Sequence, residues 1–354
     1  MNKPPQFYTQ QLQQHNDALE AIKSQLNRSS LLRLFVFLVL AFGIYLALGH
    51  ARIIVAIVIL GVALFLFLVT RHGKLQYKRD LIKRLIAINE IELKVLQRDF
   101  HELPSGETFK NPNHYFSQDI DLFGKGSFYQ YLNRTALESG AVALADTLTA
   151  NDIQDIEERQ QAIQELTQLP EWRQQFSAMA ALVRTKVSSD SVITWLKNYK
   201  AFIPKNIKRG AQLFSLISIA LITVYIVGLI SGWLLFGWFS LGLAITGRFL
   251  KRINTLAAHI SQIQSTFEQY YKLLAHIEQQ EMTSPLLKEK WSLIDNETQK
   301  ASVVLKQFSR KLDALDQRNN MLIGVLTNGF LLRDLYIVCH IESWIVLHQA
   351  AVED

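Results

Sequence analysis

A stretch without charge constrains this chain more than any other feature. It runs from Gly210 to Gly247, between Arg209 and Arg248, and contains no Asp, Glu, Lys, Arg or His. About 38 helical residues would extend about 57 Å, which is close to two crossings of a hydrocarbon core about 30 Å thick. Serine, glycine and tryptophan at 231–233 suit a turn at the membrane surface. We therefore expect a transmembrane helical hairpin over residues 210–247. A buried helix pair in a soluble core is the alternative, but helices of soluble proteins nearly always carry a polar stripe.

A second apolar block predicts another hairpin, over residues 31–70. Its two runs, Leu31–Leu48 and Ile53–Thr70, are each near the length that crosses a bilayer, and only four residues separate them. Arg33 lies close enough to one end to reach the interface. None of the four predicted spans has a charged residue near its middle, whereas transporters and channels usually need polar groups there. We expect these spans to act as anchors.

Basic residues gather at the ends of both apolar blocks. Three groups of them carry a net charge of +13, whereas the whole chain carries +6. Membrane topology explains this placement better than a nucleic-acid groove does, because segments rich in Lys and Arg stay on the cytoplasmic side. The membrane-proximal basic residues are Arg71, Lys74, Lys78, Arg79, Lys83, Arg84, Lys197, Lys200, Lys205, Lys208, Arg209, Arg248, Lys251 and Arg252.

The charge pattern also predicts a location. We expect a multi-pass protein of a bacterial-type cytoplasmic (inner) membrane, with the lipid bilayer as its partner and with the amino terminus and soluble parts in the cytoplasm. The single cysteine, Cys339, fits a reducing compartment. No cleavable signal peptide is evident, because the first thirty residues are polar and a second apolar run follows the first.

Helical patterns dominate the polar segments, so the expected fold class is all-α. Residues 1–30 are interpreted as an amphipathic helix, and residues 71–209 as a cytoplasmic helical domain. Within that domain, residues 103–113 are expected to form a loop and Ser139-Gly140 a turn. Asn151 or Asp152 is the expected N-cap of the helix that carries Ile156.

Apolar residues at alternating spacings of three and four follow the second hairpin. One series runs from Ile253 to Ile277 and another from Trp291 to Leu315. Between them, Ser284 is the expected N-cap and Pro285 the first residue of the next helix. This pattern predicts an antiparallel coiled-coil arm over residues 248–320, and two amphipathic helices in a bundle fit it equally well. Residues 321–354 are expected to form a final helical region.

Several short segments carry a resemblance to a known family. They are 119–124 (DIDLFG), 127–135 (SFYQYLNRT) with Gly140, 156–163 (IEERQQAI) and 172–174 (WRQ), with looser similarity over 312–344. In this order they resemble the core segment of MutS-family DNA mismatch-repair proteins, specifically a membrane-anchored MutS-related branch. The residues that match the family motif are Asp121, Leu122, Phe123, Asn133, Arg134, Thr135, Gly140 and Arg159.

The resemblance implies a helical core and lever, which in that family couple an ATPase domain to a DNA clamp. ATP and magnesium are implied only for a domain that this chain lacks, since no G-x-x-x-x-G-K-[ST] loop occurs and 123–127 (FGKGS) has the wrong spacing. The mismatch-reading domain is absent as well, the apolar hairpin takes the place of the clamp, and Leu137 replaces a threonine common in the family. We expect the chain to be the amino-terminal part of a longer protein or a degenerate relative.

Catalytic and cofactor sites are not evident in the sequence. The nine histidines lack ligand spacing, and Cys339 and His340 are adjacent on a predicted helix, so they point in different directions. Arg159 suits a buried ion pair better than catalysis. We therefore assign no catalytic, metal-binding or cofactor-binding residue.

Three hypotheses about function remain. The first is a membrane-anchored MutS-like core and lever module, which couples an ATPase outside this chain to membrane or DNA-associated partners. The second is the amino-terminal part of a MutS-type mismatch-repair ATPase that binds DNA. The third is a membrane scaffold that self-associates through residues 5–30 and 253–315. A homodimer is the expected oligomer, and DNA is a possible partner that no motif in this segment supports.

Overall fold

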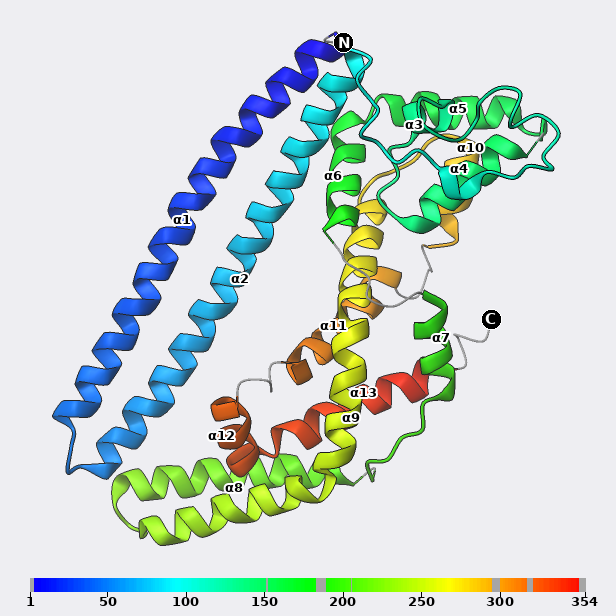
Figure 1. Cartoon of the computed structure of the whole chain (residues 1–354). Coiled ribbons are helices and arrows are strands. Elements are labelled where there is room, and N and C mark those ends of the chain that lie inside the picture. Colours follow the sequence, from blue (N-terminus) through cyan, green and yellow to red (C-terminus); the bar gives the residue numbers. More distant parts are fainter. Residues whose placement is uncertain are drawn as a thin grey trace. The chain divides into compact units, whose positions relative to one another are not determined.

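Helices make up all the regular structure that the computed structural model describes. It describes residues 3–150, 152–182, 189–204, 206–294, 300–316 and 321–349, and within these ranges it contains 13 α-helices, one short 3₁₀ helix and no strand (Figure 1). The expected all-α fold class is confirmed for these residues. The helices are α1 (Pro4–Leu46), α2 (Ala51–Leu96), η1 (Glu107–Phe109), α3 (Phe128–Leu132), α4 (Glu138–Thr149), α5 (Ile156–Thr167), α6 (Pro170–Ala181), α7 (Ser189–Asn198), α8 (Ile207–Val227), α9 (Gly232–Glu278), α10 (Pro285–Ser292), α11 (Ala301–Asp316), α12 (Met321–Leu331) and α13 (Arg333–His348).

Four helices, α1, α2, α8 and α9, are long and apolar enough to cross a membrane. Within the apolar span of each helix, at most 17 % of the residues are buried. Phe37 is 59 % exposed, Leu60 72 % and Leu216 68 %. A soluble protein rarely leaves so large an apolar surface in contact with water, whereas lipid covers such a surface at no cost. The structure therefore agrees with a multi-pass membrane protein.

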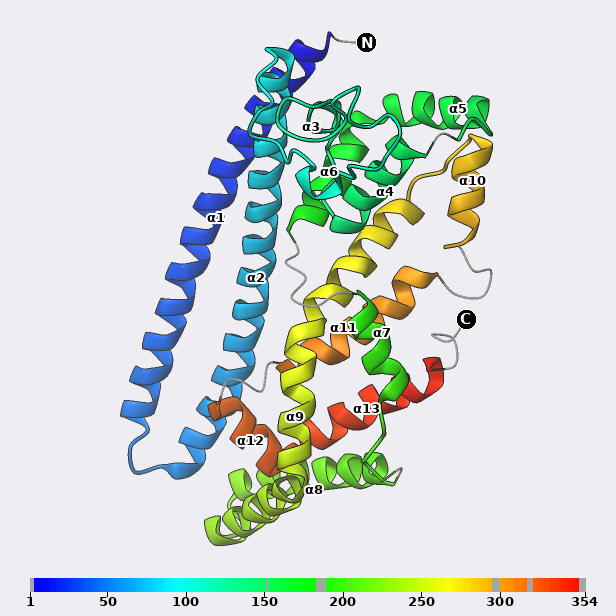
Figure 2. The same ribbon diagram turned by 45° about the vertical axis from the view of Figure 1, so that its right-hand side comes forward.

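The first predicted hairpin is formed by α1 and α2. The helices are joined at residues 47–50 and run side by side in both views (Figures 1 and 2). A Cβ atom added at Gly61 would lie 2.8 Å from the Leu40 side chain, so this glycine lets the two backbones approach closely. Further along the same pair, Ser29 Oγ lies 3.2 Å from His72 Nδ1. The antiparallel register therefore continues from the apolar part into the polar part.

The second hairpin turns between α8 and α9. Gly228 adopts a left-handed conformation (φ 97°), and its N–H donates to Tyr225 O while that of Leu229 donates to Val224 O. This pair of hydrogen bonds is a Schellman motif, in which glycine avoids the steric cost that a Cβ atom would bring. The helix thus ends a few residues before the expected break at 231–233, and α9 begins within it. Across the hairpin, Trp238 Nε1 donates to Ser218 Oγ at 2.7 Å.

Two compact units divide the chain, and each is discontinuous in sequence. Unit 1 comprises residues 1–34, 67–183 and 276–295, and unit 2 comprises residues 35–66, 184–275 and 296–354. Helices α1, α2 and α9 contribute residues to both units.

A small core of unit 1 forms around residues 122–145. Leu122, Phe123 and Tyr129 are almost fully buried and pack with Ala145 of α4. Ser127 begins α3 by accepting the Gln130 N–H at 3.1 Å. In the same unit, α5 and α10 lie next to each other in both views (Figures 1 and 2).

The core of unit 2 is a helical bundle. Phe308 of α11 stacks on Trp344 of α13 with ring centroids 3.8 Å apart, and its edge meets Phe267 of α9 at 4.9 Å. Gln264 donates to Asp313 on the same pair of helices, so α9 and α11 are antiparallel. Because α11 also packs on α13, this region corresponds to the bundle alternative and not to an isolated coiled-coil arm.

Several predicted helix limits need correction. The second heptad series is not one helix: α10 ends at Ser292, residues 293–294 form a turn, and α11 begins at Ala301. The final helical region is interrupted at Leu332, which has φ 48°. Ser139-Gly140 lies in the first turn of α4, not in a loop turn.

Two predicted helix starts have different outcomes. Helix α5 begins at Ile156 with Asp155 before it, not after Asp152, and Asn151 lies outside the described residues. The predicted start of α10, with Ser284 as N-cap and Pro285 as first residue, is confirmed.

Candidate binding site in the helical core of unit 1

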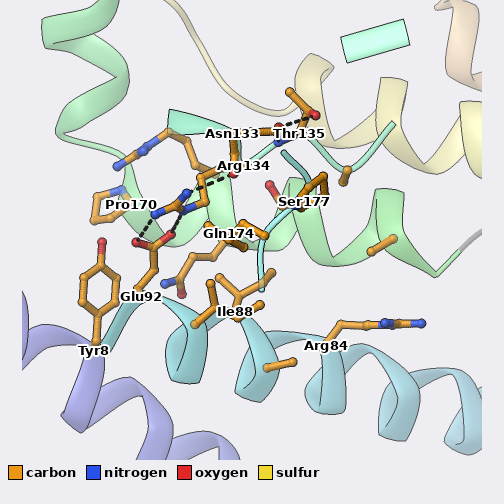
Figure 3. Close-up of a pocket in the computed structure, with 17 residues that line it drawn as sticks. Tyr8, Arg84, Ile88, Glu92, Asn133, Arg134, Thr135, Pro170, Gln174 and Ser177 are labelled. Atoms are coloured by element: carbon orange, nitrogen blue, oxygen red, sulfur yellow. Dashed lines mark hydrogen bonds and ion pairs between the residues drawn. The ribbon is translucent and has the colours of Figure 1, made fainter. Parts of the chain in front are cut away.

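A pocket of about 310 Å³ lies among four segments of unit 1. Its walls are the first turns of α1, one face of α2, helix α6 and the loop residues 133–136, with residues 103–104 closing one side (Figure 3). Pockets of this size suit small ligands. The motif residues Asn133, Arg134 and Thr135 form part of the wall.

The centre of the site is an ion pair between Arg134 and Glu92 of α2. The Nε atom of Arg134 lies 2.6 Å from Oε1 of Glu92, and Nη2 lies 3.4 Å from Oε2. Nη1 donates to the backbone oxygens of Tyr131 and Asn133, both at 2.9 Å. The guanidinium group is therefore held by the carboxylate and two carbonyls at once (Figure 3). The side chains are 33 % and 19 % exposed, so water screens this pair less than a surface pair.

Local hydrogen bonds fix the loop that carries Arg134. Asn133 is 5 % exposed, and its Oδ1 accepts both the N–H and the hydroxyl of Thr135, at 2.9 and 2.7 Å. An asparagine side chain that accepts the N–H two residues later stabilises a turn. Gly140 packs beside Thr135, with a Cβ atom built on it 3.5 Å from Thr135 Cβ. The motif residues therefore form one turn that holds the arginine in place.

An amide pair joins α2 to α6 beside the pocket. Gln174 Nε2 donates to Asn89 Oδ1 at 3.0 Å, and Asn89 Nδ2 donates to Gln174 Oε1 at 3.3 Å. Asn89 Nδ2 also donates to Leu85 O. Both side chains are buried, so the pair satisfies polar groups that would otherwise be costly in the core.

Two more arginines lie at the rim. Arg84 and Arg173 are exposed, and within the described ranges neither forms an ion pair. Tyr8 of α1 faces Glu92 (Figure 3). Burial raises the pKa of Tyr8, the negative charge of Glu92 raises it further, and the two nearby arginines, Arg173 and Arg134, oppose this rise. Three arginines and one glutamate give the pocket a formal charge of +2, which suits a small polar or anionic molecule.

Outside the pocket, two carboxylates hold other parts of the fold together. In unit 1, Glu165 of α5 accepts the N–H groups of Thr283 and Ser284 at 2.6 and 2.7 Å. Desolvation alone would raise the pKa of Glu165, but the hydrogen bonds from Ser284 and Thr283 outweigh it and lower the pKa to about 2. Also in unit 1, the ring of Trp172 on α6 stacks on the ring of His276 on α9, with ring centroids 5.1 Å apart.

In unit 2, Glu342 of α13 binds the segment that leads into α8. The side chain is 4 % exposed and accepts the hydroxyl of Tyr199 at 3.0 Å and the N–H groups of Phe202 and Ile203 at 2.9 and 3.0 Å. Burial raises the pKa of Tyr199, and the charge and hydrogen bond of Glu342 raise it further. The carboxylate therefore fixes the polar segment just before the second hairpin.

The remaining predicted site residues have structural roles or lie at the surface. Leu122 and Phe123 are core residues, and Asp121 occupies an exposed left-handed turn (φ 47°). Arg159 pairs with Asp152 at 2.8 Å, but the two side chains are 35 % and 51 % exposed, so the expected buried ion pair is not formed. Of the membrane-proximal basic residues, Arg84 lines the unit 1 pocket, while Arg248 and Arg252 line a separate groove in unit 2. Lys205 lies outside the described residues.

Sequence reasoning missed Tyr8, Glu92, Gln174, Glu165 and Glu342. A signal was available for two of them: Arg84, Ile88 and Glu92 recur every four residues on one helix face, and Glu342 is an acid within an apolar helix. Gln174 lies in the segment 172–174 (WRQ) that carries the resemblance, whereas nothing local distinguishes Tyr8.

Among the residues that the structure describes, no three His, Cys, Asp or Glu side chains come together as metal ligands. Comparison of the chain with family models, curated proteins and solved structures gave no match. The likeness to MutS therefore rests on the motif residues alone.

Proposed function

We propose that this chain is a multi-pass membrane anchor with a MutS-like helical core and lever, which transmits movement between the bilayer and a cytoplasmic partner. The membrane would be a bacterial-type cytoplasmic membrane with the polar segments on its cytoplasmic side. A nucleotide-hydrolysing domain or partner outside residues 1–354 would drive the movement. Homodimer formation and contact with DNA stay predictions of the sequence.

The length of three helices is the observation that supports this proposal. Helices α1, α2 and α9 contain 43, 46 and 47 residues, and each combines an apolar span with a polar extension in one uninterrupted helix. A helix of 47 residues is about 70 Å long, more than twice the thickness of the hydrocarbon core. An unbroken helix transmits displacement from one end to the other, whereas a flexible linker absorbs it.

Side-chain contacts at the ends of α9 and α8 support the same role. The Trp172 ring and the two hydrogen bonds between Trp172 and His276 fasten the last turn of α9 to α6. The three hydrogen bonds of Glu342 fasten the approach to α8. Displacement of these helix ends would therefore reach packed elements rather than loose chain.

A distance measurement on α9 tests the lever. In a Cys339→Ala background, Asn254→Cys and Ala275→Cys place two spin labels 21 residues apart, which is about 31 Å along a straight helix. We expect one narrow distance distribution by pulsed electron paramagnetic resonance, in detergent and in vesicles. A Gly-Gly-Ser-Gly insertion after Gln262 is the control and should broaden it. A broad distribution without the insertion would show that α9 is no lever.

A further inference from the structure

A groove of about 840 Å³ in unit 2 lies where α9 leaves its apolar span. It is lined by Ala244, Ile245, Phe249, Arg248 and Arg252 of α9, and by Pro204 from the segment before α8. Arg248 is the first charged residue after the 38 uncharged residues of the second hairpin. The groove therefore combines an apolar wall on the side of the span with a cationic end at the depth of lipid headgroups.

We propose that this groove binds the headgroup and upper acyl chain of one anionic phospholipid of the bilayer. The proposal rests on the membrane anchoring proposed above and assigns a specific lipid site to it. Arg248 and Arg252 are four positions apart on one helix, so they lie on the same face and about 6 Å apart along the axis. That spacing lets two guanidinium groups bind a single phosphate, which they match with paired N–H donors.

Charge complementarity favours this occupant. Both arginines are exposed, and no described acidic side chain forms an ion pair with either. The groove has no acidic residue in its lining. Among the residues that the structure describes, these arginines thus have no acidic partner, and a lipid phosphate supplies a counter-charge at the interface.

The opposite wall of the groove is held in place by hydrogen bonds. The Arg252 guanidinium lies 5.8 Å from the centre of the Phe202 ring, which restricts its direction. The N–H groups of Phe202 and Ile203 are bound by the buried Glu342 carboxylate at 2.9 and 3.0 Å. Pro204 follows these residues directly and forms that wall. A prepared groove costs less entropy on binding than a mobile surface does.

The apolar residues of the groove determine which way the acyl chain of a bound lipid points. Ala244 and Ile245 precede Arg248 in the chain and therefore lie nearer the apolar span. A phosphate at the arginines would place the upper part of an acyl chain along Ala244, Ile245 and Phe249. This direction is the one that a lipid of the cytoplasmic leaflet already has.

Thermal unfolding in a zwitterionic detergent tests the site. The intact chain is titrated with dioleoyl phosphatidylglycerol, with dioleoyl phosphatidylcholine and, separately, with inorganic phosphate. We expect the anionic lipid to raise the unfolding temperature more than the zwitterionic one. The double variant Arg248→Gln/Arg252→Gln should weaken the apparent affinity for the anionic lipid by about tenfold or more.

The control has the same change in charge at another basic group. Arg71→Gln/Lys74→Gln removes two positive charges next to the first hairpin, and it should keep the preference for the anionic lipid. The proposal fails if both double variants lose this preference equally, if the two lipids stabilise the chain equally, or if inorganic phosphate alone reproduces the effect. Extraction of the unmodified chain into alkaline carbonate without detergent would instead refute the membrane anchoring itself.

Discussion

Replacement of Glu342 should loosen the segment that leads into the second hairpin. Glu342→Ala removes the acceptor for the Tyr199 hydroxyl and for the N–H groups of Phe202 and Ile203. A buried donor left without a partner costs about 1–3 kcal/mol. Water can reach the half-buried Tyr199 and Phe202 in part, so we expect a loss of about 3 kcal/mol in the free energy of unfolding. Glu342→Gln keeps one acceptor oxygen and should lose about 1 kcal/mol.

Two measurements resolve this effect. Unfolding in mixed micelles gives the free-energy difference, and hydrogen exchange gives its location, because the amides of Phe202 and Ile203 should lose protection first. Glu289→Ala removes an exposed carboxylate of α10 and is the matched control. If Glu342→Ala unfolds like this control and amide exchange of residues 199–203 is unchanged, the carboxylate does not hold this segment.

Three further predictions concern unit 1 and DNA. Glu92→Gln should lower the free energy of unfolding of unit 1 by about 1–2 kcal/mol, because it leaves the half-buried Arg134 charge without a counter-ion. In a denaturant titration, the double variant Glu92→Gln/Arg134→Met should recover part of that loss. The ionised carboxylate of Glu165 stabilises the start of α10, because its folded pKa of about 2 lies below its ordinary value of 4.5. This stabilisation is present above about pH 4.5 and is lost as the pH falls towards 2. Glu165→Gln should therefore abolish this part of the acid transition. On a DNA column, retention should be weak, lost at moderate salt and equal for matched and mismatched duplexes, and tight mismatch-selective retention would favour the mismatch-repair hypothesis.

The controls for these predictions differ. Glu90→Gln, on an exposed face of α2 near Glu92, should leave the stability unchanged. For Glu165, an acid transition that is the same in the unmodified chain and in Glu165→Gln would contradict the role assigned to its hydrogen bonds from Thr283 and Ser284.

Features encoded within a short stretch of chain could be predicted from the sequence. The four apolar spans follow from length and the absence of charge alone, and all four coincide with helices. The start of α10 follows from Ser284 and Pro285, because proline is favoured at the first position of a helix, although the Ser284 side chain makes no capping hydrogen bond. The turn of the second hairpin is predicted at 231–233, which begins three residues after Gly228, the residue that ends α8. Gly228 and Gly232 lie so close together that the sequence pattern alone does not show which of them ends the helix.

Breaks that depend on tertiary packing could not be predicted. Leucine disfavours the left-handed conformation, yet Leu332 adopts it and is 4 % exposed, so the core of unit 2 stabilises what the local sequence disfavours. The second heptad series continues across residues 293–294, although the chain turns there. Periodicity reports which face is apolar, but it does not report whether one helix or two present that face.

Pairing between distant residues was also beyond local reasoning. Arg134 meets Glu92 across 42 positions, and Glu342 meets Tyr199 across 143. The motif drew attention to Arg134, but only the fold shows that its partner is on α2. Arg159 illustrates the opposite case, because its position on a helix suggested burial and the structure places it in a half-exposed pair with Asp152.

Membrane topology is the claim on which the account depends, and cysteine labelling measures it directly. In the Cys339→Ala background, single cysteines replace His50 and Ser231 at the two hairpin turns, and Lys125 in the exposed loop before α3. In intact cells, a membrane-impermeant maleimide should label the first two positions, and Lys125→Cys should react only after the membrane is opened. Labelling of Lys125→Cys in intact cells, or protection of both turns from outside, would contradict the proposed arrangement of four spans.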